Sequence, residues 1–174
     1  MKTKDIVSIS LFTTLLAVCA WIYIPMTIPF TMQTFAVFLA MLVLGGKKGT
    51  IVIFIYLLSG FLGVPVFSGG TAGPAILLGP TGGYMIGWIF LGVLFWGTEK
   101  LLLQRNKLEI LMLVIGLIIC YLVGTFWFVN IYASEGTNTA YGAAFSACVL
   151  PFVIPDLAKL ALARTVSRRI KKFI

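Results

Sequence analysis

The stretch "PFVIPDLAKLALA", residues 151–163, is apolar apart from two side chains, Asp156 and Lys159. An acid and a base that lie three residues apart on a helix share one face. Because a lone charge at bilayer depth is costly, charged residues inside apolar spans usually pair and mark a pathway or a site. The segment therefore predicts a membrane helix with a paired acid and base, which either binds a ligand or locks the helix onto a neighbour.

The composition of the whole chain is that of an integral membrane protein. Of its 174 residues, 60% are hydrophobic and 10% are charged, and the mean hydropathy is +1.09. Soluble domains carry about a quarter charged residues. The length suits one domain over residues 1–174, and spans of about 20 apolar residues each leave room for several crossings.

The apolar runs predict six transmembrane helices and an all-α fold. Pro151 and Pro155 would interrupt a single C-terminal helix, so we expect a short outer element over 140–150 and a last span that begins at Pro155. Asp156 would then lie in the first turn of that span, at its outer end. The other five spans are expected at about 6–24, 33–45, 49–63, 84–98 and 108–132.

The basic residues predict the orientation of these spans. With six spans, both termini and every Lys and Arg except Lys159 fall on one side, whereas the opposite connections (25–32, 64–83 and 133–139) contain neither residue type. The positive-inside rule makes the basic side cytoplasmic. The net charge of +8 is therefore expected to meet membrane lipid headgroups and not nucleic acid. The basic groups are Lys2 and Lys4; Lys47 and Lys48; Lys100, Arg105 and Lys107; and Arg164, Arg168, Arg169, Lys171 and Lys172.

The connection over 64–83, "VPVFSGGTAGPAILLGPTGG", is rich in glycine and proline and carries no charge. Irregular backbone at membrane depth persists only where protein or a water-filled cavity surrounds it, and glycine lets a chain approach a ligand closely. The segment is either an ordinary outer loop or a plug that folds into the protein.

Four further residues are candidates with an alternative structural role. Gln33, at the outer entry to the second span, either faces headgroup water or enters a pocket. Tyr84, beside the glycine-rich connection, belongs either to the interfacial aromatic belt or to the same pocket. Thr13 and Ala17 form a small-xxx-small pair that permits close helix approach, to a span of this chain or to another protein.

Several kinds of chemistry have no residues to support them. The chain has no histidine, its three cysteines (Cys19, Cys120 and Cys148) are far apart, and no GxxxxGK[ST] motif is present. We therefore expect no metal, no cofactor and no ATP hydrolysis. An intramembrane enzyme with Lys159 as nucleophile or base lacks any accompanying catalytic group.

Four segments together resemble the BioY family, the biotin-specific S components that capture substrate for energy-coupling-factor (ECF) transporters. They are "IPFTMQTFAVFLAMLVLGGKKGT" (28–50), "IYLLSGFLGVPVFSGG" (55–70), "GPTGGYMIGW" (79–88) and "PFVIPDLAKLALA" (151–163). The resemblance covers about residues 10–165. It implies a multi-pass S-component fold in a bacterial or archaeal cell membrane, with biotin bound near the outer side.

The resemblance also implies roles for particular residues. Asp156 and Lys159 match the Asp-x-x-Lys of the family and would contact the ligand. The 64–83 loop would cover the site through Gly70, Thr71, Ala72 and Gly73, with Thr71 standing where family members often carry asparagine. The first span, with Thr13 and Ala17, would pack on a transmembrane coupling subunit that works with two ATPase subunits. An S component for another vitamin, or a purely structural membrane subunit, are the alternatives.

Overall fold

The computed structural model describes residues 2–26, 28–102, 106–134 and 141–172. They form eight α-helices, one 3-10 turn and a two-stranded antiparallel ribbon in these ranges. The helices are α1 (Thr3–Trp21), α2 (Gln33–Leu44), α3 (Gly46–Phe61), α4 (Pro74–Leu77), α5 (Gly82–Leu102), α6 (Asn106–Ser134), α7 (Tyr141–Cys148) and α8 (Leu150–Ile170). The strands are β1 (Tyr23–Ile24) and β2 (Phe30–Thr31), and the 3-10 turn is η1 (Ser68–Gly70).

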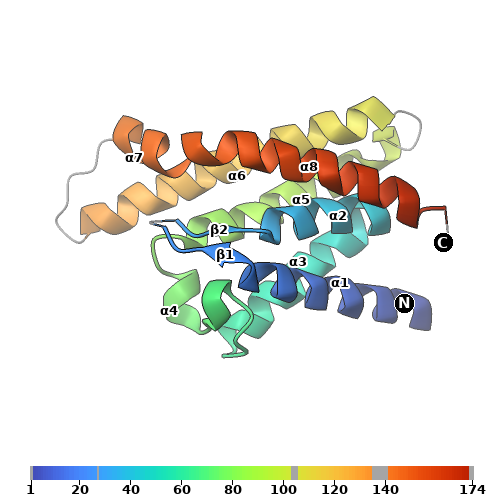
Figure 1. The fold of residues 1–174 in the computed structure, drawn as a ribbon, viewed down its shortest axis with the longest axis horizontal. Coiled ribbons are helices and arrows are strands. Elements are labelled where there is room, and N and C mark those ends of the chain that lie inside the picture. The colour runs from blue at the N-terminus through green and yellow to red at the C-terminus, as the bar shows by residue number, and fades with distance from the viewer. Residues whose placement is uncertain (1, 27, 103–105, 135–140, 173–174) are drawn as a thin grey trace.

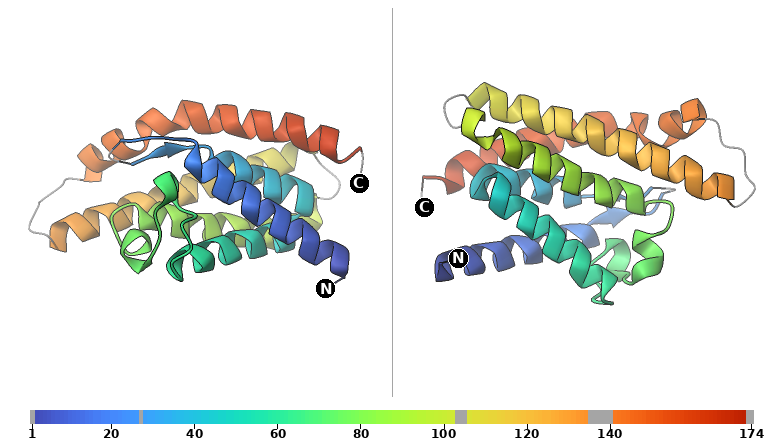
Figure 2. Two further views of the ribbon diagram at one scale, coloured as in Figure 1. Left: turned by 60° about the horizontal axis from the view of Figure 1, so that its bottom comes forward. Right: turned by 180° about the vertical axis from the view of Figure 1, so that it is seen from behind.

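The longer helices run along one axis of the molecule (Figure 1). The start of α1 and the end of α8 lie at the same end, and α4 lies toward the opposite end (Figures 1 and 2). The interior is built around α2, which packs against α8, α1 and α3. Residues 36–42 of α2 are all buried, so this helix is enclosed by its neighbours.

The expected spans correspond to helices, but their lengths differ. Among the described residues, two helical segments are long and apolar enough to cross a membrane, Thr3–Trp21 and Leu108–Tyr132, and the bent pair α7 and α8 adds a third if it is one span. The helix α2 has 12 residues, about 18 Å at 1.5 Å per residue, which is short of a hydrocarbon core of about 30 Å. The helical membrane fold is confirmed, and the number of six spans stays a prediction.

The expected start of the last span was wrong by five residues. The helix α8 begins at Leu150 and contains Pro155, and it meets α7 at an angle of 41°. Pro151 lies in the first turn, where its missing N–H is not needed. Pro155 forfeits one backbone hydrogen bond, and the burial of the apolar α8 side chains Phe152, Leu160 and Ala163 offsets that loss. Asp156 is therefore not in the first turn but about 9 Å from the start of α8 at Leu150.

One residue anchors the connection between α3 and α5. Phe67 is fully buried, and its ring lies where a side chain at Gly60 would have to go. The Gly73 N–H donates to the Gly60 carbonyl at 2.8 Å, which returns the chain to the end of α3. Gly70 and Thr71 are exposed. The connection is thus a surface loop with one inserted aromatic residue. This arrangement is intermediate between the two expectations, an ordinary outer loop and a plug that folds into the protein.

Candidate functional site

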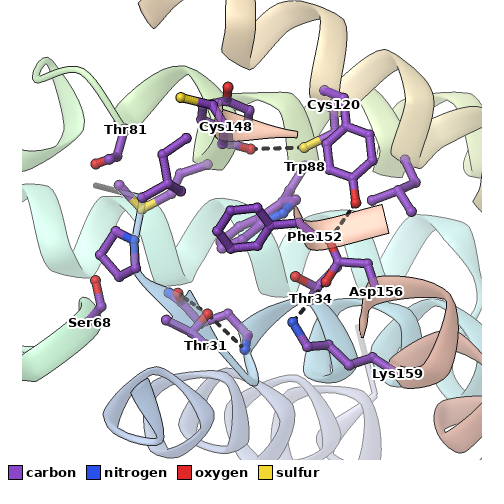
Figure 3. Close-up of a pocket in the computed structure, with 17 residues that line it drawn as sticks. Thr31, Thr34, Ser68, Thr81, Trp88, Cys120, Cys148, Phe152, Asp156 and Lys159 are labelled. Atoms are coloured by element: carbon purple, nitrogen blue, oxygen red, sulfur yellow. Dashed lines mark hydrogen bonds and ion pairs between the residues drawn. The ribbon is translucent and has the colours of Figure 1, made fainter. Parts of the chain in front are cut away.

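A pocket between α2, α5, α6 and α8 brings together several of the sequence candidates (Figure 3). Its volume is about 80 Å³. Asp156 and Lys159 lie at one end, and Ser68 and Thr81 lie at the other (Figure 3). The 17 lining residues are Ile28, Pro29, Thr31, Gln33, Thr34, Ser68, Thr81, Tyr84, Met85, Trp88, Leu117, Cys120, Tyr121, Cys148, Phe152, Asp156 and Lys159.

The acid and base of α8 form a buried ion pair at one end of this pocket. The Lys159 Nζ donates to Asp156 Oδ1 at 2.8 Å, and the two residues are 5% and 4% exposed. The hydroxyl of Tyr121, from α6, donates to Asp156 Oδ2 at 2.7 Å. The ammonium of Lys159 also lies 4.1 Å from the centre of the Phe30 ring, within the range of a cation–π contact.

These contacts leave hydrogen-bonding capacity for a ligand. A carboxylate has about four lone-pair positions and an ammonium has three N–H donors. Tyr121 and Lys159 each take one position on Asp156, one on each oxygen. The pair is therefore stable when the pocket is empty, because neither charge is isolated, and it can still accept from and donate to a polar group that enters.

Gln33 lines the pocket from the start of α2, where it is 5% exposed. Its Nε2 donates to the Tyr56 hydroxyl at 2.5 Å, and its Oε1 accepts from the Thr31 hydroxyl at 2.8 Å. Sequence reasoning placed Gln33 either in headgroup water or in a pocket, and in the structure it is in the pocket.

Tyr84 also lines the pocket and lies in the first turn of α5. Its ring packs where a side chain at Gly124 would have to go, so the glycine allows α6 to approach α5 closely. Its hydroxyl lies 3.3 Å from the Thr125 hydroxyl. Together with Trp88 and Phe152, this ring makes the middle of the pocket predominantly aromatic.

The four loop candidates are not among the residues that line the pocket in this structure. They are Gly70, Thr71, Ala72 and Gly73. The Thr71 hydroxyl donates to the backbone carbonyl of Ser68 at 3.0 Å, and Ser68 lines the pocket, as does Thr81 further along the same connection. Their predicted contact with a ligand stays a prediction.

Thr13 and Ala17 lie away from the pocket, half-buried on α1. The Thr13 hydroxyl donates to the Ile9 carbonyl of its own helix at 2.9 Å, and Ala17 packs against the core. Their predicted contact with another subunit likewise stays a prediction.

Sequence reasoning did not find Tyr121, Ser68 or Thr81. Tyr121 lies in the middle of the apolar run of α6, so no local pattern distinguishes it from an ordinary aromatic residue of a membrane helix. In the described part of the chain, no group of three or more His, Cys, Asp or Glu residues is arranged to hold a metal ion.

A helical membrane protein with a pocket between its helices, polar at both ends and aromatic in the middle, is a membrane-embedded ligand-binding protein. Comparison with known proteins identifies the family within this class. The model of the BioY family matches residues 1–174, and the chain belongs to the BioY family.

Two relatives and one solved structure illustrate the similarity. The chain is 38% identical over 172 residues to the probable biotin transporter BioY of Pyrococcus horikoshii, covering 98% of each protein. It is 39% identical over 173 residues to the biotin transporter BioY of Thermotoga maritima, covering 97% of this chain and 96% of that one. A crystal structure of the S-component for biotin from an ECF-type ABC transporter matches with a TM-score of 0.84 and 27% identity, over 99% of this chain and 95% of that one. The family predicted from the residues is confirmed, and the chain is a transport protein and not an enzyme.

Proposed function

We propose that this protein is the biotin-binding S component of an ECF-type vitamin uptake transporter and that it captures biotin from the outer side of the membrane. The observation that carries the proposal is the buried pair of Asp156 and Lys159 in the pocket of a BioY-family chain. An acceptor and a donor held side by side suit a ligand group that has N–H donors next to a carbonyl oxygen.

The ureido ring of biotin is such a group. Its N–H groups would donate to Asp156 and its carbonyl oxygen would accept from Lys159, each as a charge-assisted hydrogen bond. The apolar body of the ligand would lie against Trp88 and Phe152. The carboxylate would then reach the hydroxyl groups of Ser68 and Thr81 at the other end. In the reversed orientation, Lys159 would pair with the carboxylate instead.

The loop from 64 to 73 must move for the ligand to enter. The pocket volume of about 80 Å³ is well below the ~300–1,000 Å³ of most small-molecule sites. Because Ser68 lies at the pocket edge, an outward displacement of this segment would enlarge the space. On its return, Gly70, Thr71, Ala72 and Gly73 would cover the ligand.

The finer topology and the partners are part of the same proposal. Six crossings, formed by α1, α2, α3, α5, α6 and α8, would place both termini and the basic groups in the cytoplasm of a bacterial or archaeal cell. Thr13 and Ala17 on α1 would contact the transmembrane coupling subunit, and two ATPase subunits would supply the energy. Single-cysteine labelling at Lys2 and at Gly69 in intact cells tests the orientation, since only the outer position reacts with an impermeant reagent.

Calorimetry on the purified protein in detergent tests the ligand, with biotin, desthiobiotin, thiamine and riboflavin as titrants. One-to-one binding of biotin that excludes thiamine and riboflavin is expected. Biotin methyl ester then distinguishes the two orientations, since it binds nearly as well as biotin only if Lys159 holds the ureido oxygen. A folded protein that binds another of these vitamins, or none, would overturn the assignment of biotin.

A further inference from the structure

Tyr56 of α3 links the pocket to the loop that edges it. Its side chain is fully buried, and it does not line the pocket itself. Its hydroxyl accepts from Gln33 Nε2 at 2.5 Å and donates to the backbone carbonyl of Val66 at 2.8 Å. One side of this hydroxyl therefore meets a pocket residue, and the other meets the backbone of the loop.

The carbonyl of Val66 determines the direction of every hydrogen bond in this chain of contacts. A carbonyl oxygen can only accept, so the Tyr56 hydroxyl must give its proton to Val66 and accept from Gln33. The Gln33 amide must then turn its NH₂ toward Tyr56 and its oxygen toward the donating hydroxyl of Thr31. Donors that point the same way strengthen one another in a low-dielectric interior. The position of the loop thus determines which atoms of Gln33 and Thr31 remain for a ligand.

The ring of Tyr56 holds the same part of the loop by packing. Its centre lies 5.7 Å from that of Phe67, and the two rings meet at 75°, edge to face. Phe67 follows Val66 directly and precedes Ser68, which lines the pocket. Release of the Val66 carbonyl would therefore loosen both the anchor of the loop and the pocket edge.

We propose that Tyr56 is a positioning residue that couples the closed position of the 64–73 loop to the orientation of the Gln33 amide, and through it to ligand retention. In this proposal, the identity of the ligand rests on the proposed function. The coupling between loop and pocket belongs to the empty protein, so it can be tested without any ligand.

The first experiment is hydrogen–deuterium exchange of residues 66–73 in the ligand-free protein, compared among wild type, Tyr56→Phe, Gln33→Met and the double variant. Tyr56→Phe keeps the ring and removes both hydrogen bonds. We expect about tenfold faster exchange in this segment, the size expected for losing a net hydrogen bond. Gln33→Met should also accelerate exchange, although Gln33 bonds Tyr56 and Thr31 and not the loop. In the double variant, Gln33→Met should not accelerate exchange beyond the rate of Tyr56→Phe alone.

The matched control is Tyr132→Phe, which removes a hydroxyl from a ring that packs on Phe128 outside the pocket. Its loop exchange should equal that of the wild type. Exchange in Tyr56→Phe equal to that of the wild type would overturn the coupling. An acceleration in the double variant equal to the product of the two single-variant accelerations would overturn it as well. If Tyr56→Phe does not fold, Gln33→Met alone still tests the coupling. A wild-type exchange rate of the loop in Gln33→Met would exclude coupling through Tyr56.

The second experiment measures the dissociation rate of labelled biotin from the same variants. We expect about tenfold faster release from Tyr56→Phe, with no further increase in the double variant. Equal release from wild type and Tyr56→Phe would refute the role in retention. If the wild type does not bind biotin, the proposed function fails while the exchange measurements still decide the coupling.

Discussion

The ion pair of Asp156 and Lys159 makes opposite predictions for single and double substitutions. Lys159→Met keeps the length of the side chain but removes the charge that faces Asp156 at 2.8 Å. Asp156 is 4% exposed, so its carboxylate would keep only the hydrogen bond from Tyr121. Removing one partner of a buried pair costs about 3–5 kcal/mol. We therefore expect a clear loss of thermal stability in this single variant.

The double variant Asp156→Asn/Lys159→Met should recover most of that stability. Replacing a buried ion pair with neutral groups of similar volume is often neutral or stabilising. Thermal unfolding in detergent, followed by the loss of monodisperse protein, measures both variants against wild type. A single variant as stable as wild type would show that the pair is solvated or loosely held, contrary to its burial.

Ligand binding by the double variant separates a ligand site from a structural lock. The variant has lost at least one charge-assisted hydrogen bond to the ligand, worth about 1.5–3 kcal/mol, or roughly 10- to 150-fold in affinity. Calorimetry with biotin should therefore show weak or undetectable binding by a stable protein. Wild-type affinity in the stable double variant would refute the reasoning, since the pair would then serve only to hold α8 in place.

The remaining predictions concern the support of the site. Tyr121→Phe should weaken biotin binding by about 10-fold, because Asp156 loses the hydrogen bond that orients it, and calorimetry beside Tyr132→Phe checks this; equal affinities would contradict it. Gly60→Ala should displace Phe67, since the new methyl group would occupy the position of its ring. Faster proteolysis of the 64–73 loop would report this displacement, whereas an unaltered cleavage rate would show that Phe67 does not anchor the loop. The native protein in detergent should resist maleimide and take up three equivalents only after denaturation in SDS, because all its cysteines are buried; rapid native labelling would contradict their burial. These are Cys19, Cys120 and Cys148.

The sequence predicted the helical fold and the family because both depend on local patterns. Apolar runs of helical length, and the glycine-rich and Asp-x-x-Lys segments, can be recognised residue by residue. The error in the start of α8 has a local cause as well. Both Pro151 and Pro155 suit a first turn, and the sequence does not say which of them begins the helix. In the structure, α8 begins at Leu150, continues through Pro155 and packs against α2.

The site was predicted in part for the same reason. Asp156 and Lys159 stand out because charges are rare in apolar segments, and Gln33 and Tyr84 because they border irregular ones. Tyr121 could not be found in this way, since it meets Asp156 across 35 positions of sequence. Tyr56 was equally hidden, because its importance lies in what its hydroxyl touches and not in its type.

By itself, the sequence determined that this chain is a helical membrane protein of the BioY family with an acid–base pair at apolar depth. These properties follow from hydropathy, charge placement and short motifs, which act within a few residues. The tertiary structure alone decided that Tyr121 orients Asp156, that Ser68 and Thr81 bring the 64–83 connection to the pocket, and that Tyr56 joins Gln33 to the loop. Such contacts depend on the distances between helices that are remote in sequence, and packing determines those distances.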